Sequence, residues 1–138
     1  NTHLQGRWQV LSRRPLVVCD TGHNVNGIVE IVRQLSHTPK GRLFMVFGMV
    51  NDKDVDGVLA LLPKEAQYCF AQASVQRALD SRELARRAAR FSLRGEAYPD
   101  CESAFRAARQ QAGPQDMIFV GGSTFVVADV LEALSKQE

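Results

Sequence analysis

The 138-residue chain is predicted to adopt an α/β fold, a doubly wound and mostly parallel sheet of about six strands with helices on both faces. The prediction rests on an alternation along the chain. Short apolar stretches rich in β-branched and aromatic residues alternate with segments in which apolar residues recur at helical spacing. No repeat, low-complexity tract or interdomain linker interrupts this alternation, so residues 1–138 are expected to form one domain.

Each expected strand is a short apolar run. The run from Leu16 to Cys19 is apolar throughout, which suits a strand buried on both faces. The run near Glu96 to Tyr98 is the weakest of the set. In chain order, the expected strands are Trp8 to Leu11, Leu16 to Cys19, Leu43 to Phe47, Tyr68 to Ala71, Glu96 to Tyr98 and Met117 to Val120.

Each expected helix carries one apolar stripe for packing on the sheet. Pro63 ends the second helix, because proline cannot continue a helix interior. Asp80, followed three residues later by Glu83, resembles a capping box that opens the third. The helices are expected at about 25–36, 55–62, 80–90 and 101–112, and the last has Val127, Val130, Leu131 and Leu134 on its inner face.

The composition limits the classes of function. With 45% hydrophobic and 23% charged residues, the chain is typical of a soluble globular protein, and it has no apolar run long enough for a membrane helix. A formal charge of +2 is too small to imply a nucleic-acid or membrane partner. Cys19, Cys69 and Cys101 form no Cys-x-x-Cys pair, which argues against a disulfide framework or a structural zinc site and favours a reducing cytoplasm.

The loops that follow the strands are where a ligand is expected, because ligands of doubly wound sheets bind outside the carboxyl ends of the strands. The second strand leads into a polar turn, Asp20-Thr21-Gly22-His23-Asn24, at the start of a helix. Helix amino termini favour anions, an aspartate at a strand end can accept both ribose hydroxyls, and a histidine can donate to a phosphate. The turn therefore indicates a nucleotide site. The alternative is that Asn24 only caps the helix and His23 is a surface residue.

Two further loops precede helices and offer groups for an anionic ligand. After the third strand, Lys53 stands between Asp52 and Asp54. Lys53 is a candidate for holding an anion, or else a solvated charge in a turn that one of the aspartates caps. After the last strand, Ser123 and Thr124 follow two glycines, and they offer hydroxyls to a phosphate or carboxylate or else cap the last helix.

Together, four motifs resemble those of the carboxy-terminal domain of folylpolyglutamate and dihydrofolate synthases, members of the Mur ligase superfamily. They are Gly6-Arg7-Trp8-Gln9, Asp20-Thr21-Gly22-His23-Asn24, Asp52-Lys53-Asp54 and Gly122-Ser123-Thr124-Phe125. The likeness extends over nearly the whole chain, with one departure at Val25, where the family more often has a replaceable proline. The resemblance implies a Rossmann-like domain of a cytoplasmic enzyme that uses ATP to activate a carboxylate as an acyl phosphate. L-glutamate would then be joined to the activated group of dihydropteroate or a folate.

The resemblance also implies roles for residues on the nucleotide side. Asp20 would bind the ribose of ATP, with Asn24 in the same nucleotide-binding turn. His23 would lie near the nucleotide or the transferred phosphate. Arg7, in a hinge segment of residues 1–7, would reach phosphate groups and stabilise the charge that develops during phosphoryl transfer.

On the glutamate side, the resemblance implies that Lys53 and Ser123 pair with the carboxylates of the amino acid.

The chain has no Gly-x-x-x-x-Gly-Lys-Ser/Thr loop, the motif that holds nucleotide phosphates. The family keeps that loop, its Mg²⁺ ligands and most of the folate site in an amino-terminal domain. Residues 1–138 are therefore expected to be one domain of a larger enzyme and to be inactive alone.

Other functions are weighed against this one. A dinucleotide-binding oxidoreductase needs Gly-x-Gly-x-x-Gly after the first strand of its unit, and the turn at 20–25 does not have it. A phosphoacceptor signalling module needs a lysine after a late strand, where this chain has Gly-Gly-Ser-Thr. A Mur-type ligase for another amino acid and a non-catalytic nucleotide-binding module remain alternatives. Arg82, Arg86 and Arg90 share one helix face, a candidate contact for RNA or an acidic partner but more simply a solvated face.

Overall fold

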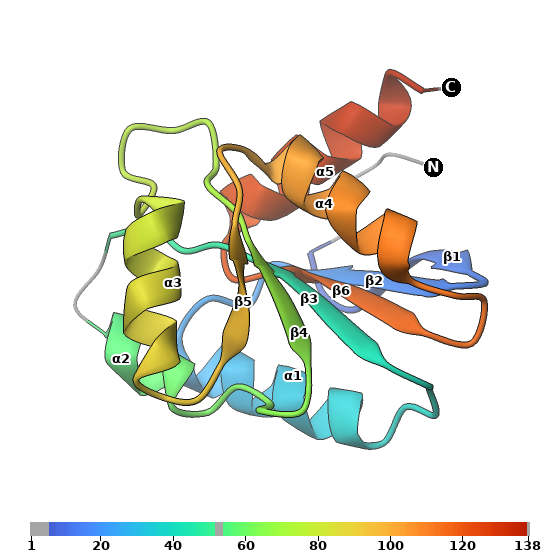
Figure 1. Ribbon diagram of the computed structural model, residues 1–138, viewed down its shortest axis with the longest axis horizontal. Helices are drawn as coiled ribbons and strands as arrows, with labels where there is room; N and C mark the ends of the chain where they lie inside the picture. Colours follow the sequence, from blue (N-terminus) through green and yellow to red (C-terminus); the bar gives the residue numbers. More distant parts are fainter. Residues whose placement is uncertain (1–5, 52–53, 138) are drawn as a thin grey trace.

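The computed structural model describes residues 6–51 and 54–137. Its sheet has six strands in the order β1-β2-β6-β3-β4-β5 (Figure 1). All neighbouring strands are parallel except β1 and β2. The strands are β1 (Gln9–Arg13), β2 (Leu16–Asp20), β3 (Leu43–Phe47), β4 (Gln67–Phe70), β5 (Arg94–Ala97) and β6 (Met117–Gly121). The helices are α1 (Val25–Ser36), α2 (Val55–Leu59), α3 (Ser81–Ala89), α4 (Cys101–Gln111) and α5 (Thr124–Ser135).

Helices cover both faces of the sheet, which confirms the predicted doubly wound α/β fold. The apolar sides of α1, α2 and α3 pack on one face, where Ile31, Val58 and Leu84 join a single buried cluster. The apolar sides of α4 and α5 pack on the other face in a second cluster, with Phe105 and Val130 among its members. Figure 1 shows the two groups of helices on opposite sides of the sheet.

The antiparallel pairing of β1 and β2 follows from the short link between them. Arg13 pairs with Leu16, so only Arg14 and Pro15 lie between the strands. Two residues can close a hairpin, whereas a parallel pair needs a crossover of about a dozen residues or more. Strand β1 therefore forms an antiparallel edge on a sheet that is otherwise parallel.

Three elements differ from the sequence prediction by two residues or more, and the first is strand β1, which ends at Arg13 and not at Leu11. Helix α2 ends at Leu59 and not at about 62, because the chain tightens into a turn in which the N–H of Leu62 donates to the carbonyl of Leu59. Leu62 is still buried, which explains why its position fits the helical pattern. Strand β5 begins at Arg94, two residues before the predicted start, and it is a largely exposed edge strand without the apolar run that sequence patterns detect.

The strand register brings the predicted functional loops to one edge. Asp20 pairs with Gly121, and Gly121 pairs with Phe47 on its other side. The loops after β2, β6 and β3 therefore begin at the same level of the sheet. Helix α1 leaves β2 toward one face, whereas α5 leaves the adjacent β6 toward the other. Such a point of divergence is where doubly wound sheets open a crevice for ligands.

Candidate functional site

A cavity of about 390 Å³ opens at this divergence, between the β2–α1 turn and the start of α5. It is lined by Arg7, Thr21, Gly22, His23, Asn24, Asn26, Gly27 and Thr124. Residues from the start of the chain, from the predicted nucleotide turn and from the last helix thus meet in one place. The structure brings together Arg7, His23 and Asn24, which are three of the predicted site residues.

The floor of the cavity is the amino terminus of α1. Asn24 is the N-cap of this helix, and its Oδ1 accepts a hydrogen bond of 2.9 Å from the N–H of Gly27. Asn24 therefore caps α1, and its predicted place in the nucleotide site stays a prediction. The first turn of α1 carries no acidic side chain that would compete for its positive end. This terminus is accordingly suited to an anionic group of a ligand.

Asp20 directly precedes the lining residue Thr21 and is almost fully buried, with 1% of its side chain exposed. Its Oδ2 accepts a 2.9 Å hydrogen bond from the N–H of Trp8. Its Oδ1 accepts a 2.8 Å hydrogen bond from the N–H of Gly22 and lies 2.9 Å from Nε of Arg7. The carboxylate thus already has protein donors on both oxygens. The ribose contact predicted for Asp20 stays a prediction.

His23 is exposed on the rim of the same cavity. Its Nδ1 lies 3.3 Å from the carbonyl oxygen of Thr21. When Nδ1 carries the proton, it donates to that carbonyl and leaves Nε2 as an acceptor in the neutral ring or a donor in the protonated ring. The imidazole can therefore exchange a proton or a hydrogen bond with a ligand through Nε2.

The loops after β3 and β4 pair with each other. Val50 and Ala78 form an antiparallel bridge, and the N–H of Asn51 donates to the carbonyl of Arg77 over 2.7 Å. Arg77 thus lies on the functional edge beside the β3–α2 loop, and it does not line the cavity of His23. The predicted glutamate ligand Lys53 lies outside the described residues, so its role stays a prediction.

Ser123 is the N-cap of α5. Its Oγ accepts hydrogen bonds of 3.1 Å from the N–H groups of both Phe125 and Val126, and only 2% of the residue is exposed. The capping alternative is confirmed for Ser123, and its predicted contact with glutamate stays a prediction. Its neighbour Thr124 lines the cavity instead.

Thr21 is a site residue to which the sequence interpretation gave no role. Both its N–H and its hydroxyl donate to the carbonyl of Gly6, over 2.7 and 2.8 Å. Its partner is distant in sequence, so no local pattern reveals the contact.

Behind the turn, Cys19 is buried, and burial together with the charge of Asp20 raises the pKa of its thiol to about 11. Cys19 is therefore a protonated packing residue near neutral pH and no nucleophile.

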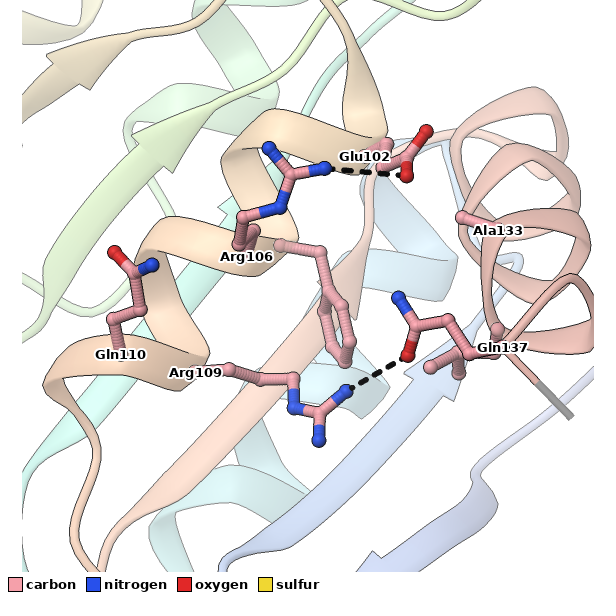
Figure 2. A pocket seen from close by; sticks show the side chains of 8 residues that line it. Glu102, Arg106, Arg109, Gln110, Ala133 and Gln137 are labelled. Atoms are coloured by element: carbon pink, nitrogen blue, oxygen red, sulfur yellow. Dashed lines mark hydrogen bonds and ion pairs between the residues drawn. The ribbon is translucent and has the colours of Figure 1, made fainter.

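A second hollow of about 300 Å³ lies between α4 and α5 (Figure 2). Phe105 forms part of its wall, with the Arg106–Glu102 ion pair and the Arg109–Gln137 hydrogen bond beside it. None of its lining residues belongs to the loops at the carboxyl ends of the strands. The hollow is therefore separate from the candidate site.

Neither a metal-binding cluster nor a membrane-spanning helix is found in the described part of the chain. Residues 6–51 and 54–137 hold no group of three or more His, Cys, Asp or Glu side chains that could bind a metal ion. Within the same residues, no helix has the length and apolar character to cross a bilayer. The candidate site is thus a polar cavity built from one arginine, one histidine and two helix amino termini.

Comparison with known proteins gives a consistent match. The family described as Mur ligase, glutamate ligase domain, matches residues 6–124. The dihydrofolate synthase/folylpolyglutamate synthase of Escherichia coli is 31% identical over 134 residues, which cover 95% of this chain and 31% of that protein.

Solved structures agree. E. coli FolC in complex with DHPP and ADP superposes with a TM-score of 0.89 at 29% identity, over 97% of this chain and 32% of that one. A bifunctional folylpolyglutamate synthase/dihydrofolate synthase with Mn, AMPPNP and L-glutamate bound superposes with a TM-score of 0.86 at 34% identity. The match covers 96% of this chain and 32% of that one. The chain thus spans about a third of the length of these relatives.

Proposed function

Because the chain belongs to the Mur ligase glutamate ligase domain family, we propose that it is the carboxy-terminal domain of an ATP-dependent ligase that adds L-glutamate to dihydropteroate or to a tetrahydrofolate (poly)glutamate. One observation carries the proposal: Arg7, His23 and the amino terminus of α1 surround one cavity at the divergence of β2 and β6. Solved structures of relatives that cover 96–97% of the chain have ADP, or AMPPNP and L-glutamate, bound.

The cavity suits the phosphate groups of ATP. In the proposed reaction, a carboxylate oxygen of the folate substrate attacks the γ-phosphorus, and ADP leaves. The amine of glutamate then attacks the acyl phosphate carbon, and inorganic phosphate leaves as the amide forms. Arg7 and the free N–H groups of α1 are placed to neutralise charge on the phosphate oxygens. His23 offers Nε2 to the nucleotide or to the transferred phosphate.

The binding sites for glutamate, Mg²⁺ and the folate substrate are proposed to lie outside this cavity. Lys53 and Ser123 are proposed to lie on the glutamate side, at the loops after β3 and β6. A phosphate-binding loop, the ligands of Mg²⁺ and most of the folate site are proposed to lie in an amino-terminal domain of the same enzyme, joined through residues 1–7. Three free, buried cysteines support the proposed cytoplasmic location, since thiols persist in reducing compartments.

The test uses the complete enzyme that contains this chain. Purified enzyme with ATP, Mg²⁺, L-glutamate and dihydropteroate or tetrahydrofolate is expected to form ADP and a glutamylated product, which mass spectrometry detects. Parallel reactions with other amino acids separate the glutamate ligase from a related ligase with another substrate. No amide product with any of these pairs would refute the proposal.

A matched pair of variants tests the cavity. His23→Ala is expected to lower kcat/KM for ATP by about 100-fold, the loss typical of removing one group that stabilises developing charge. His37→Ala is the control, because His37 is an exposed histidine at the opposite end of α1 whose Nδ1 contacts only local groups, Arg33 and Ser36. Equal activity of the two variants would place the nucleotide elsewhere.

A further inference from the structure

Another polar cavity lies at the opposite edge of the sheet, where β3, β4 and β5 begin. We call it the amino-edge cavity. Its volume is about 650 Å³, within the range of about 300–1,000 Å³ that is usual for small-molecule sites. Its lining comes from the loops that enter the three strands, residues 41–43, 64–67, 92 and 94. It shares no residue with the cavity of His23, which lies at the carboxyl ends of the strands.

Each of these three loops brings one cation to the amino-edge cavity. Arg42, Lys64 and Arg94 line it, together with a single acidic residue, Glu65. The loops gather because β3, β4 and β5 are parallel neighbours and begin at the same edge of the sheet. The wall of the cavity thus carries an excess of positive charge, which attracts anions.

Cations at this edge also lie near the carboxyl ends of helices, where they can serve the fold alone. Lys40 has that role, because its ammonium donates to the carbonyls of Leu35 and Thr38 at the end of α1. Lys64 and Arg94 differ from it. Neither side chain forms an ion pair or a hydrogen bond within residues 6–51 and 54–137. Their charges are therefore available to a ligand.

Arg42 offers a guanidinium that is already oriented. Its Nε and Nη2 donate to the carboxylate of Asp116, and Nη2 also donates to the carbonyl of Gln111. The carbon of the guanidinium lies 5.2 Å from the ring centroid of Phe44. Nη1 has no acceptor among the described residues. A fixed guanidinium loses little conformational freedom when its remaining donor binds a ligand.

Ser92 has a conformation that stability alone does not favour. It follows α3 with a φ of 64°. Its N–H donates to the carbonyl of Ala89, and the N–H of Leu93 donates to that of Ala88. Glycine is the usual residue at this position of a helix end, because a Cβ is strained there. The Ser92 hydroxyl lines the cavity and bonds to no group in the described part of the chain. Strain of this kind is often kept where a ligand binds.

We propose that the amino-edge cavity binds a small polyanion, a molecule with two or more phosphate or carboxylate groups. The planar forks of Arg42 and Arg94 match both kinds of group. Lys64 adds a mobile positive charge, and Ser92 adds a hydroxyl donor. Cations from three separate loops favour a ligand with several anionic groups over a single one. The site is additional to the proposed ligase function and does not depend on it.

The experiment measures binding to the complete enzyme by isothermal titration, with tricarballylate in one arm and pyrophosphate in the other. Excess Mg²⁺ and AMPPNP keep the nucleotide site occupied. Hydrogen–deuterium exchange is expected to slow in residues 41–43, 64–67 and 92–94. Binding of tricarballylate alone would assign carboxylate groups, and binding of pyrophosphate alone would assign phosphate groups. Absence of binding in both arms, or protection confined to the β2–α1 turn, would overturn the inference.

Charge-removing variants locate the site independently. Lys64→Gln and Arg94→Gln are each expected to weaken anion binding by about 3- to 5-fold, the value of one exposed ion pair, and the double variant by about 10-fold or more. Arg82→Gln is the matched control, because Arg82 is an exposed arginine at the other end of α3, outside the cavity. Its affinity is expected to equal that of the parent. Equal weakening by Arg82→Gln and Arg94→Gln would show nonspecific attraction of anions and would contradict the site.

Variants of Ser92 separate binding from stability. Ser92→Gly removes the strained Cβ and is expected to raise the melting temperature, whereas loss of the hydroxyl weakens anion binding by about 2- to 10-fold. Ser92→Ala keeps the Cβ, so it is expected to bind like Ser92→Gly and to melt like the parent. Parental affinity in both variants would contradict the inference. These measurements give their answer whether or not the enzyme forms a glutamylated product, so the two proposals fail separately.

Discussion

Replacement of Gly122 by alanine is expected to be among the most damaging single changes at the functional edge. Gly122 has a φ of 100°, a region that costs a residue with a Cβ about 1–2 kcal/mol. The added Cβ would also lie 3.0 Å from the ring of Phe47 and would overlap the backbone carbonyl oxygen of Gly48. Overpacking of this kind costs about 1–3 kcal/mol. We therefore expect Gly122→Ala to lower the free energy of unfolding by about 2–5 kcal/mol, a large part of the stability of a typical domain.

The assay is urea unfolding of the chain, followed by circular dichroism, with Gly113→Ala as the control. Gly113 has no positive φ, and a Cβ there meets only a carboxylate oxygen of Asp116, at an ordinary distance of 3.6 Å. Its replacement is expected to change the free energy of unfolding by less than about 1 kcal/mol. If Gly122→Ala and Gly113→Ala unfold at the same urea concentration, the reasoning from φ and close approach is refuted.

Three further predictions concern caps and titrating groups. Ser123→Ala removes the α5 cap and is expected to lower the free energy of unfolding, measured by thermal unfolding, by about 1 kcal/mol. Ser123→Thr is expected to change this free energy little, because its hydroxyl can still cap the helix. The N–H groups of Gly113 and Arg42 and then the Arg42 guanidinium lower the pKa of Asp116. Asp116→Asn should therefore destabilise the domain at neutral pH. The difference between the melting curves of the two proteins should begin to shrink below about pH 4, where the unfolded carboxylate gains a proton, and should vanish as the pH falls through the lowered pKa of the native Asp116. Since the pKa of Cys19 is raised to about 11, its alkylation at pH 8 should be slow in the native chain and fast in urea; rapid native labelling would contradict its burial.

Much of the fold could be predicted from the sequence because local patterns and the global arrangement agree. Helix α1 and strand β3 have their predicted bounds, since apolar spacing and flanking polar residues mark both ends. The cap at Asp80 is also confirmed, because its carboxylate accepts from the N–H groups of Arg82 and Glu83. The bounds of strand β5 and helix α2 were harder to predict. The start of β5 was misplaced because an exposed strand needs no apolar run, and α2 ended early because a tight turn keeps Leu62 buried without helical hydrogen bonds.

The candidate site was predictable in its place but only partly in its roles. Topology brings the turn after β2 to the crevice of the sheet, and this follows from strand order and the direction of the helices. What a side chain does there depends on partners distant in sequence. The contacts of Asp20 with Trp8 and of Thr21 with Gly6 join segments more than ten residues apart, and no local pattern encodes them. The same polar residue types serve caps and ligand sites, so Asn24 and Ser123 fitted both interpretations.

Trp8 is the only tryptophan of the 138-residue chain, and it lies in the segment that Asp20 holds. Its indole, packed near Phe119, should emit at shorter wavelength than an indole in water. Release of the first residues from the sheet would shift this emission to the red while the far-ultraviolet signal of the helices stayed constant. The chain thus carries a built-in optical reporter that distinguishes local detachment of its amino-terminal segment from cooperative unfolding.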